Sequence, residues 1–224
     1  MEIETLSVTN SIVEYLRGKI IIGELPGGQR LNENQLAPKL GISRPPMREA
    51  FRILEHEHVI VSIPRKGVYI KELSINDCQE VYQMREMLEC FAVDLLKAQN
   101  ISSLPGVSSA LTSASGLIIP PDDDQEQRIK YLKTFADFHI KLVEASGNNR
   151  LSYFYKSIQS TLYRYQFMYL SLPGAGPHSL DDHHQILNLV ETGAYEKAKK
   201  YLKAHIDRTF KLLEVKMKED KVKG

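Results

Sequence analysis

The spacing of apolar residues differs between the two parts of the chain. It predicts short helices and strands in the first part and long helices in the second. Ile12, Leu16 and Ile20 recur at helical intervals, which predicts a first helix over about 10–22 that ends at Gly23. This helix is the first element of a segment that combines helices and strands, and the pattern after it indicates the fold class.

Two more helices and a hairpin are expected before residue 74. Asn32 and, three residues later, Gln35 form a capping-box pattern, which predicts a second helix that ends at Gly41. A third helix is expected over about 46–58. The segment VIVSIPRKGVYI (59–70) has two β-branched runs around a Pro-Arg-Lys-Gly turn, a pattern typical of a β-hairpin. Together these elements predict a winged helix-turn-helix.

The pattern after about Ser74 is helical throughout. Helices are expected near 76–98, 125–146, 149–170, 179–192 and 194–218. The uncharged, serine-rich segment 101–121 fits either a short helix from Pro105 or a loop. The sequence therefore predicts a mainly α protein, with a winged helix-turn-helix domain over 1–74 and an all-helical bundle over 75–224.

Two adjacent prolines stand in front of the third helix, in GISRPPMREAFRILE (41–55). A proline inside a helix costs ~3 kcal/mol, but it fits the first turn, where the N–H groups have no intrahelical acceptor. The residue before a proline is pushed out of the α region. We therefore expect the helix to begin at Pro46, with Arg44 extended just before it.

The arginines at the start of this helix indicate contact with DNA. In a helix-turn-helix the N-terminal end of the second helix enters the major groove, where Arg44 and Arg48 can bind guanine O6 and N7. Ser43 and the helix N-terminus suit a phosphate. Arg52 lies deeper in the helix, and for it we favour a solvated face paired with acidic neighbours.

A run of about fifty residues carries several motifs in a fixed order. They are Pro26-Gly27, Leu36-Ala37, the Ser-Arg-x-Pro-x-Arg-Glu-Ala run over 43–50, and a proline–basic–glycine wing tip. This run resembles the DNA-binding domain of GntR-family bacterial transcription regulators. Pro45 stands where the family usually has a small hydroxyl residue, and His58 where glycine is common.

The resemblance implies how the domain would meet DNA. Base contacts would come from Arg44 and Arg48, and wing contacts from the tip formed by Arg65, Lys66 and Gly67. The family, together with the geometry of helix-turn-helix operators, implies a homodimer on double-stranded DNA with inverted half-sites.

Three histidines lie on apolar helical faces in the second half of the chain. His139, His183 and His205 each fall in the middle of the apolar stripe of a different expected helix. A single such histidine is more often a hydrogen-bonded core residue than a ligand. Three of them, on helices that must pack together, can converge on a metal ion.

These histidines belong to a second set of matching segments: REMLE (85–89), FHIKLVEASGN (138–148), and SLDDHHQIL (179–187) followed by His205. The set resembles the all-helical FCD effector domain of the FadR subfamily. In its metal-binding members, three histidines and an aspartate four residues before the first one hold a divalent ion, for which zinc and nickel are the candidates here.

The aspartate position of that ligand set is Phe135 in this chain. Asp137 lies on roughly the opposite side of the helix from His139 and does not easily replace it. Two possibilities stay open: a three-histidine site completed by water or a carboxylate ligand, and a metal-free pocket.

Arg85 is the first candidate for binding an organic effector. It flanks an apolar stripe, so it can face the bundle interior and bind a carboxylate, or it can pair with Glu89 one helical turn later. Asn148, in the second matching segment, and Arg164, on a tyrosine-rich helix, are further effector-binding candidates.

Composition narrows the remaining possibilities. No apolar run approaches the ~20 residues that a membrane span needs, and the first residues are acidic where a signal peptide is basic, so we expect a cytoplasmic protein without an export signal. Cys78 and Cys90 fall on one helix about 18 Å apart, too far for a disulfide.

The basic residues are concentrated in one short segment. Residues 43–71 carry six basic and three acidic side chains, an excess that favours nucleic acid as the partner of this region.

The sequence thus predicts a dimeric, ligand-responsive transcription regulator, and a repressor in preference to an activator. Its helical domain would bind a small organic acid, with or without a divalent metal. The alternative is an enzyme, a three-histidine metal-dependent hydrolase with an appended winged helix, but the face-centred positions near the histidines lack the Asp or Glu that would act as its base. A metal sensor without organic effector would need a complete ligand set, against which Phe135 argues.

Overall fold

The computed structural model describes residues 2–121, 123–170 and 172–223. The chain forms two compact units, one comprising Met1–Leu73 with Gln159–Arg164, the other Ser74–Ile158 with Tyr165–Gly224. Each unit is described by itself below.

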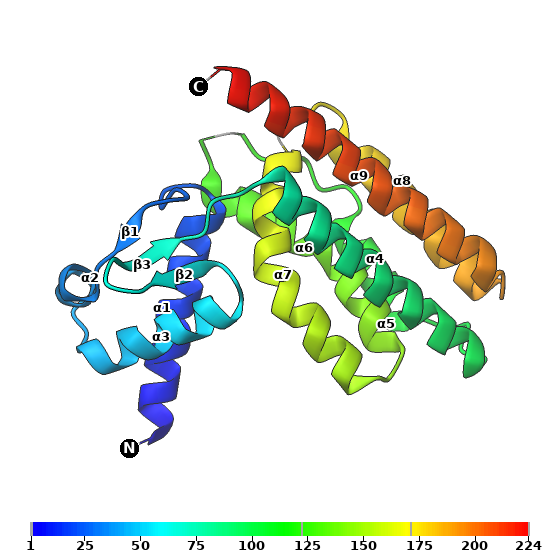
Figure 1. Ribbon diagram of the computed structural model, residues 1–224. Helices are drawn as coiled ribbons and strands as arrows, with labels where there is room; N and C mark the ends of the chain where they lie inside the picture. Colours follow the sequence, from blue (N-terminus) through cyan, green and yellow to red (C-terminus); the bar gives the residue numbers. More distant parts are fainter. Residues whose placement is uncertain (1, 122, 171, 224) are drawn as a thin grey trace. The chain divides into compact units, whose positions relative to one another are not determined.

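The first unit combines three helices with a small antiparallel sheet (Figure 1). The helices are α1 (Glu2–Ile21), α2 (Glu33–Lys39) and α3 (Arg44–His56), and the strands are β1 (Arg30–Leu31), β2 (Ile60–Ile63) and β3 (Gly67–Ile70). The sheet order is β1-β3-β2, and the β2–β3 hairpin pairs Ile60 with Ile70. This arrangement confirms the predicted winged helix-turn-helix and adds β1, which at two residues is too short to give a sequence pattern.

Apolar residues from all three helices and the sheet meet in one core. Leu16 of α1 and Met47, Ala50 and Leu54 of α3 are completely buried. The α3 residues recur at intervals of three and four, so they occupy one face of the helix and leave the opposite face to the solvent. The core therefore fixes which side of α3 is presented outwards.

The predicted start of this helix is wrong by two residues. Helix α3 begins at Arg44, and the extended residue before it is Ser43, with φ −80° and ψ 164°. The proline bias against an α conformation at the preceding residue is a preference, and it is outweighed here. Both prolines lie within the first turn, where a missing N–H costs no intrahelical bond.

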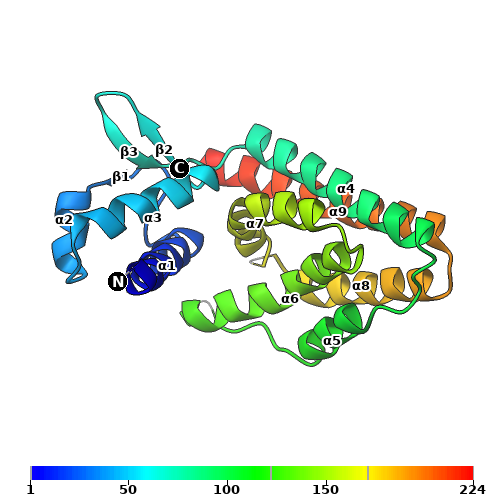
Figure 2. The ribbon, with the colours of Figure 1, turned by 90° about the horizontal axis from the view of Figure 1, so that it is seen from below.

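The second unit is a bundle of helices. Its elements are α4 (Ile75–Ala98), α5 (Pro105–Ala114), α6 (Gln125–Ala145), α7 (Asn149–Leu170), α8 (Ala175–Glu191) and α9 (Tyr195–Lys223), and residues 159–164 of α7 group with the first unit. Figures 1 and 2 both show α9 lying along α4 and α8, which it contacts. Segment 101–121, which the sequence left open, contains the short helix from Pro105.

Helix α8 begins four residues earlier than the sequence indicates. Gly174 precedes it in the left-handed region, at φ 72°, a conformation that glycine adopts without strain. Pro177 then falls in the first turn of α8, where it is tolerated. The glycine at position 174 thus marks the turn, and the helix expected near 179–192 extends back to Ala175.

Two further expectations concern chemistry and membranes. Cys78 and Cys90 lie on α4 and are both free thiols. Among the described residues, no helix is both long and apolar enough to cross a membrane.

Candidate nucleic-acid interface and histidine site

The N-terminal end of α3 presents the predicted arginines to solvent. Pro46 and Met47 are buried, whereas Ser43, Arg44 and Arg48 are exposed on the opposite face. The hydrophobic face of α3 thus holds the helix in the core while its outer face offers guanidinium groups.

Arg48 has an acidic neighbour that the sequence did not reveal. Its Nε lies 3.6 Å from Oε2 of Glu33, the first residue of α2, and 63% of the Arg48 side chain stays exposed. An exposed ion pair of this kind contributes at most about 1 kcal/mol, so Arg48 can exchange Glu33 for another partner. Arg52 pairs with Glu49 at 3.6 Å, the solvated arrangement that was favoured for it.

The tip of the β2–β3 hairpin carries the other predicted contacts. Arg65 and Lys66 are exposed, and Arg65 has φ 64°, which turns the chain sharply at the tip. At Gly67, with φ 114°, an added Cβ would lie 3.0 Å from Nε of Arg30. Arg30 of β1 is therefore a third exposed cation beside the wing; sequence reasoning missed it because only the strand pairing brings it there.

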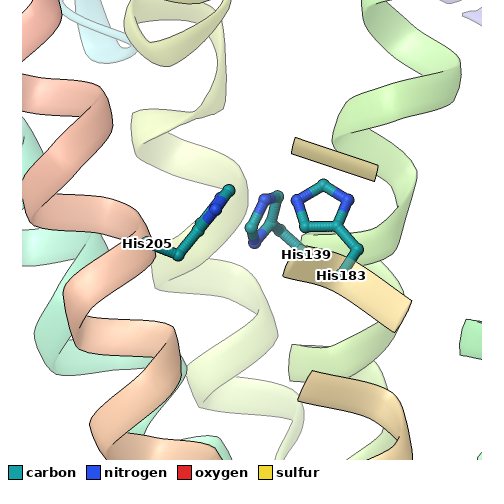
Figure 3. A group of neighbouring side chains, drawn as sticks. All are labelled: His139, His183 and His205. Atoms are coloured by element: carbon teal, nitrogen blue, oxygen red, sulfur yellow. The ribbon is translucent and has the colours of Figure 1, made fainter. Parts of the chain in front are cut away.

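In the second unit, the three predicted histidines converge from three helices. His139 comes from α6, His183 from α8 and His205 from α9, and each is at most 3% exposed. Figure 3 shows the rings facing one another, with centroids separated by 4.6 Å (139–183), 4.9 Å (183–205) and 5.5 Å (139–205). One nitrogen of each ring lies within 4.8 Å of the others.

Carboxylates hold two of these rings in place from behind. Oε2 of Glu89 lies 2.8 Å from Nδ1 of His139, and Oδ2 of Asp182 lies 2.8 Å from Nδ1 of His205. Each Nδ1–H donates to its carboxylate, so the lone pair of each ring is on Nε2. This carboxylate–histidine arrangement is the one that orients histidine ligands in metal sites.

His183 is held mainly by packing. Its ring stacks on Phe138, with centroids 4.1 Å apart and an interplanar angle of 7°. Its Nε2 lies 3.3 Å from Oγ of Ser179, and its Nδ1 is buried with no hydrogen-bond partner in the described part of the chain.

Arg85 occupies the centre of this site and resolves the two alternatives left by the sequence. It is 1% exposed and both faces the bundle interior and pairs with Glu89: its Nε donates to Oε1 of Glu89 at 2.8 Å. Its Nη2 lies 2.6 Å from Nε2 of His139. Because a guanidinium only donates, Nε2 of His139 is the acceptor of this hydrogen bond.

The charges of the site follow from burial. Burial, together with the nearby charge of Arg85, lowers the pKa of His139 to about 3. Burial also lowers the pKa of His183 well below its usual range, and that of His205 in the same direction. Burial alone would raise the pKa of Glu89, but His139 and Arg85 outweigh it and hold this pKa at about 2. At neutral pH the site therefore contains neutral imidazoles and an Arg85–Glu89 ion pair.

A small cavity lies against the histidines. Its volume is about 30 Å³, and its lining includes Arg85, Phe135 and Gln166 as well as the three rings. This is room for about one water molecule or metal ion. Oε1 of Gln166, like Nδ1 of His183, is buried and has no partner among the described residues. Because buried polar atoms are normally paired, these two favour a ligand that brings a cation or a hydrogen-bond donor.

The donor set fits a metal ion in part. Three neutral imidazoles on oriented rings can hold a divalent ion such as zinc, which prefers nitrogen ligands in tetrahedral geometry. The fourth position has no carboxylate, because the cavity wall one turn before His139 is the ring of Phe135, as the sequence predicted.

The other two effector candidates lie elsewhere among the described residues. Oδ1 of Asn148 accepts from the backbone N–H groups of Arg150 and Leu151, each at 3.1 Å, so Asn148 caps α7. Arg164 is buried within the α7 segment that groups with the first unit. Neither lines the histidine cavity.

Comparison with known families matches both units. Residues 8–70 match the family described as bacterial regulatory proteins, gntR family, and residues 80–208 match the FCD domain. The histidines, Arg85 and Glu89 all fall within the second match.

Individual relatives align with this chain over most of their length. The chain is 28% identical over 207 residues to the HTH-type transcriptional regulator YdhC of Bacillus subtilis, covering 92% of this chain and 91% of that one. It is 28% identical over 175 residues to the gluconate operon transcriptional repressor of Bacillus licheniformis, covering 77% and 68%. The crystal structure of a GntR transcriptional regulator from Rhodococcus sp. RHA1 has the same fold, with a TM-score of 0.70, 24% identity, and coverage of 92% and 97%.

Adjacent histidines on α8 offer a matched test of the histidine site. In protein purified without chelator, His183→Ala should lower the content of bound zinc or nickel per chain at least fivefold, because it removes one of the nitrogen ligands. His184→Ala, at the exposed neighbouring position, should leave it unchanged. Elemental analysis measures both, and an equal metal content in the two variants would show that the three rings do not form a metal site.

Proposed function

The chain belongs to the gntR family of bacterial regulatory proteins and carries an FCD domain, and we propose that it is a repressor that a small organic acid controls. It is a DNA-binding transcription regulator and not an enzyme, which excludes the hydrolase alternative. The identity of the chain as a regulator rests on the family; the repressing role and the effector are our proposal.

One observation supports an organic acid as the effector: a buried arginine lines the cavity of the FCD domain. Arg85 already binds one carboxylate, that of Glu89, and its Nη2 donates to Nε2 of His139. Guanidinium groups form strong, bidentate pairs with carboxylates, above all where water is excluded. Because the cavity holds little more than one water, the acid must enter by displacing side chains. Effector contacts of Asn148 and Arg164 stay predictions.

Repression and cytoplasmic action are proposed from the relatives. The Bacillus licheniformis relative is a transcriptional repressor of a gluconate operon, and gluconate is itself a small organic acid. We propose the same sign of regulation here and the same chemical class of effector. A regulator that binds chromosomal DNA would act in the cytoplasm.

Helix α7 links the cavity to the start of the second unit. Gln166 and Tyr169 of α7 line the cavity. Tyr165, on the same helix, contacts Ser74, the first residue of the unit. The Tyr165 hydroxyl lies 3.1 Å from the Ser74 carbonyl oxygen and 2.7 Å from Oδ2 of Asp77. Ser74 caps α4 and directly follows the winged domain in the sequence. A ligand that moves α7 would therefore change the first turn of α4.

The exposed face of α4 supports a homodimer. Met84, Met87 and Phe91 are 38%, 55% and 48% exposed and follow one another at intervals of three and four, so they share one side of the helix. A stripe of large apolar side chains on a helix surface is typical of a protein interface. Two winged domains joined in this way would meet two half-sites of an inverted operator.

Operator binding tests the assignment of α3. Arg48→Ala should abolish preference for the operator over unrelated DNA, because it removes a base contact, whereas Lys66→Ala should weaken binding to both by a similar factor. Arg52→Ala is the matched control on the same helix and should change little. Fluorescence anisotropy with the two DNAs measures this, and an unchanged operator preference in Arg48→Ala would refute the groove assignment.

Ligand response tests the role of α7. In a screen of small organic acids that includes gluconate, at least one acid should raise the melting temperature of the wild-type protein. The same acid should dissociate the protein from its operator. Tyr165→Phe should keep both the thermal shift and operator binding but lose most of the ligand-induced release. Normal release by this variant would rule out Tyr165 as the link, and the absence of any responding acid would contradict the proposed effector class.

The oligomeric state tests the stripe on α4. Phe91→Glu should convert a dimer into a monomer at micromolar concentration, because it places a charge in the proposed interface. Ile118→Glu, at a position 87% exposed, is the control and should not change the mass. Sedimentation equilibrium distinguishes the two species, and a dimeric Phe91→Glu would place the interface elsewhere.

A further inference from the structure

The sheet of the winged domain has a core face and a solvent face. Leu31 of β1, Ile60 of β2 and Ile70 of β3 are buried in the core. Because side chains alternate along a strand, the positions next to them point away from the core. Arg30 lies on this outer face of β1, and its partner across the β1–β3 ladder is Tyr69. The register of the sheet therefore presents a cation on the outer face of the wing.

Gly67 leaves the space in which the Arg30 side chain lies. Gly67 stands two positions before Tyr69 on β3, so it belongs to the same face of the sheet. A Cβ at Gly67 would lie 3.0 Å from Nε and 3.2 Å from Nη2 of Arg30, which is closer than such contacts normally come. The guanidinium thus packs against the glycine, directly after the exposed cations Arg65 and Lys66 of the wing tip.

Arg30 differs from its neighbours in its freedom to bind an external anion. Two exposed arginines of α3, Arg48 and Arg52, each pair with a glutamate. Arg30 is exposed as well, but it has no acidic partner among the described residues. An external anion would therefore meet no competing carboxylate at Arg30.

The position of Arg30 connects the two regions expected to contact DNA. On one side its guanidinium lies against Gly67 at the wing tip. On the other side β1 leads directly to Asn32, which caps α2, and Glu33 at the start of α2 lies 3.6 Å from Arg48 of α3. DNA presents a closely spaced row of phosphates along each strand. A protein that contacts DNA at the wing tip and at α3 can therefore also reach a phosphate from a cation between them.

We propose that Arg30 binds a phosphate of the DNA backbone and that Gly67 positions it for this contact; the inference rests on the DNA-binding regulator proposed above. The edge of the sheet then forms a third contact region, beside α3 and the wing tip. Phosphate contacts fix the orientation of a protein on DNA and carry no sequence information directly. Arg30 thus strengthens binding to any DNA sequence and leaves the choice of sequence to the arginines of α3.

The salt dependence of DNA binding tests this contact in the full-length protein. The probe is a fluorescent duplex that the wild-type protein enriches from a pool of random sequences, and anisotropy gives its Kd at several chloride concentrations. Arg30→Gln should weaken binding several-fold and lower the slope of log Kd against log salt by about 0.9 for each bound subunit, because one phosphate contact is lost. Arg30→Lys should keep most of the slope, since a lysine also pairs with a phosphate as a point charge.

A matched variant separates this contact from a general loss of charge. Arg52→Gln removes the same charge from the exposed face of α3 and should leave the slope unchanged. A wild-type slope in Arg30→Gln, or an equal decrease in Arg52→Gln, would overturn the proposal. If the wild-type protein enriches no duplex, the DNA-binding regulator itself is contradicted, whereas enrichment with an unchanged slope in Arg30→Gln contradicts only the contact of Arg30.

A double variant tests the role of Gly67. Gly67→Ala should displace the guanidinium, so adding Arg30→Gln to it should lower the slope no further. If Arg30→Gln lowers the slope in this background by as much as in the wild type, Gly67 does not position Arg30. The slopes of Arg30→Gln and Arg30→Lys decide the phosphate contact even if Gly67→Ala does not fold.

Discussion

A completely buried carboxylate, that of Glu89, holds the centre of the helical unit together. It accepts hydrogen bonds from Arg85 on its own helix, from His139 on α6 and from the hydroxyl of Tyr155 on α7, each at 2.8 Å. A buried ion pair is often no more stable than apolar residues of the same volume, but loss of one partner leaves an uncompensated charge and is strongly destabilising. With three donors the charge of Glu89 is well satisfied, and the network sets where α4, α6 and α7 meet. The orientation of His139, and through it the geometry of the whole histidine site, depends on this one group.

Arginine serves the two units in opposite ways. In the winged domain, Arg44 and Arg48 lie on the exposed face of a helix whose other face is locked into the core, and their guanidinium groups stay available for a polyanion. In the helical domain, Arg85 is buried and is held by Glu89 and His139. The first arrangement favours binding that depends on surface charge, and the second favours recognition of a single small anion. In the function proposed above, the first arrangement would read DNA and the second would sense a ligand.

The sequence predicts the elements of this fold well and the contacts between them poorly. Apolar periodicity and capping residues locate the winged domain, the long helices and the convergence of three histidines, because these signals are local or follow from helical faces. The strand β1, at two residues, has no period to detect, and the start of α3 at Arg44 depends on a balance between the pre-proline bias and the tolerance of a first turn. The pairing of Arg48 with Glu33 joins two helices, and the bond between Arg85 and His139 joins residues 54 positions apart. The sequence allowed Arg85 to face either Glu89 or the interior, and only the packed structure shows that it does both.

The contact between Arg85 and His139 is the centre of this account, and the imidazole nitrogens report on it directly. Long-range proton–nitrogen correlation spectra of the ¹⁵N-labelled protein, assigned with a His139→Gln variant, distinguish a ring nitrogen that accepts a hydrogen bond from one that binds a metal. We expect His139 in the free protein to be neutral and protonated at Nδ1, with Nε2 as the acceptor of the hydrogen bond from Arg85. A His139 protonated at Nε2, or one whose Nε2 accepts no hydrogen bond, would contradict the contact with Arg85.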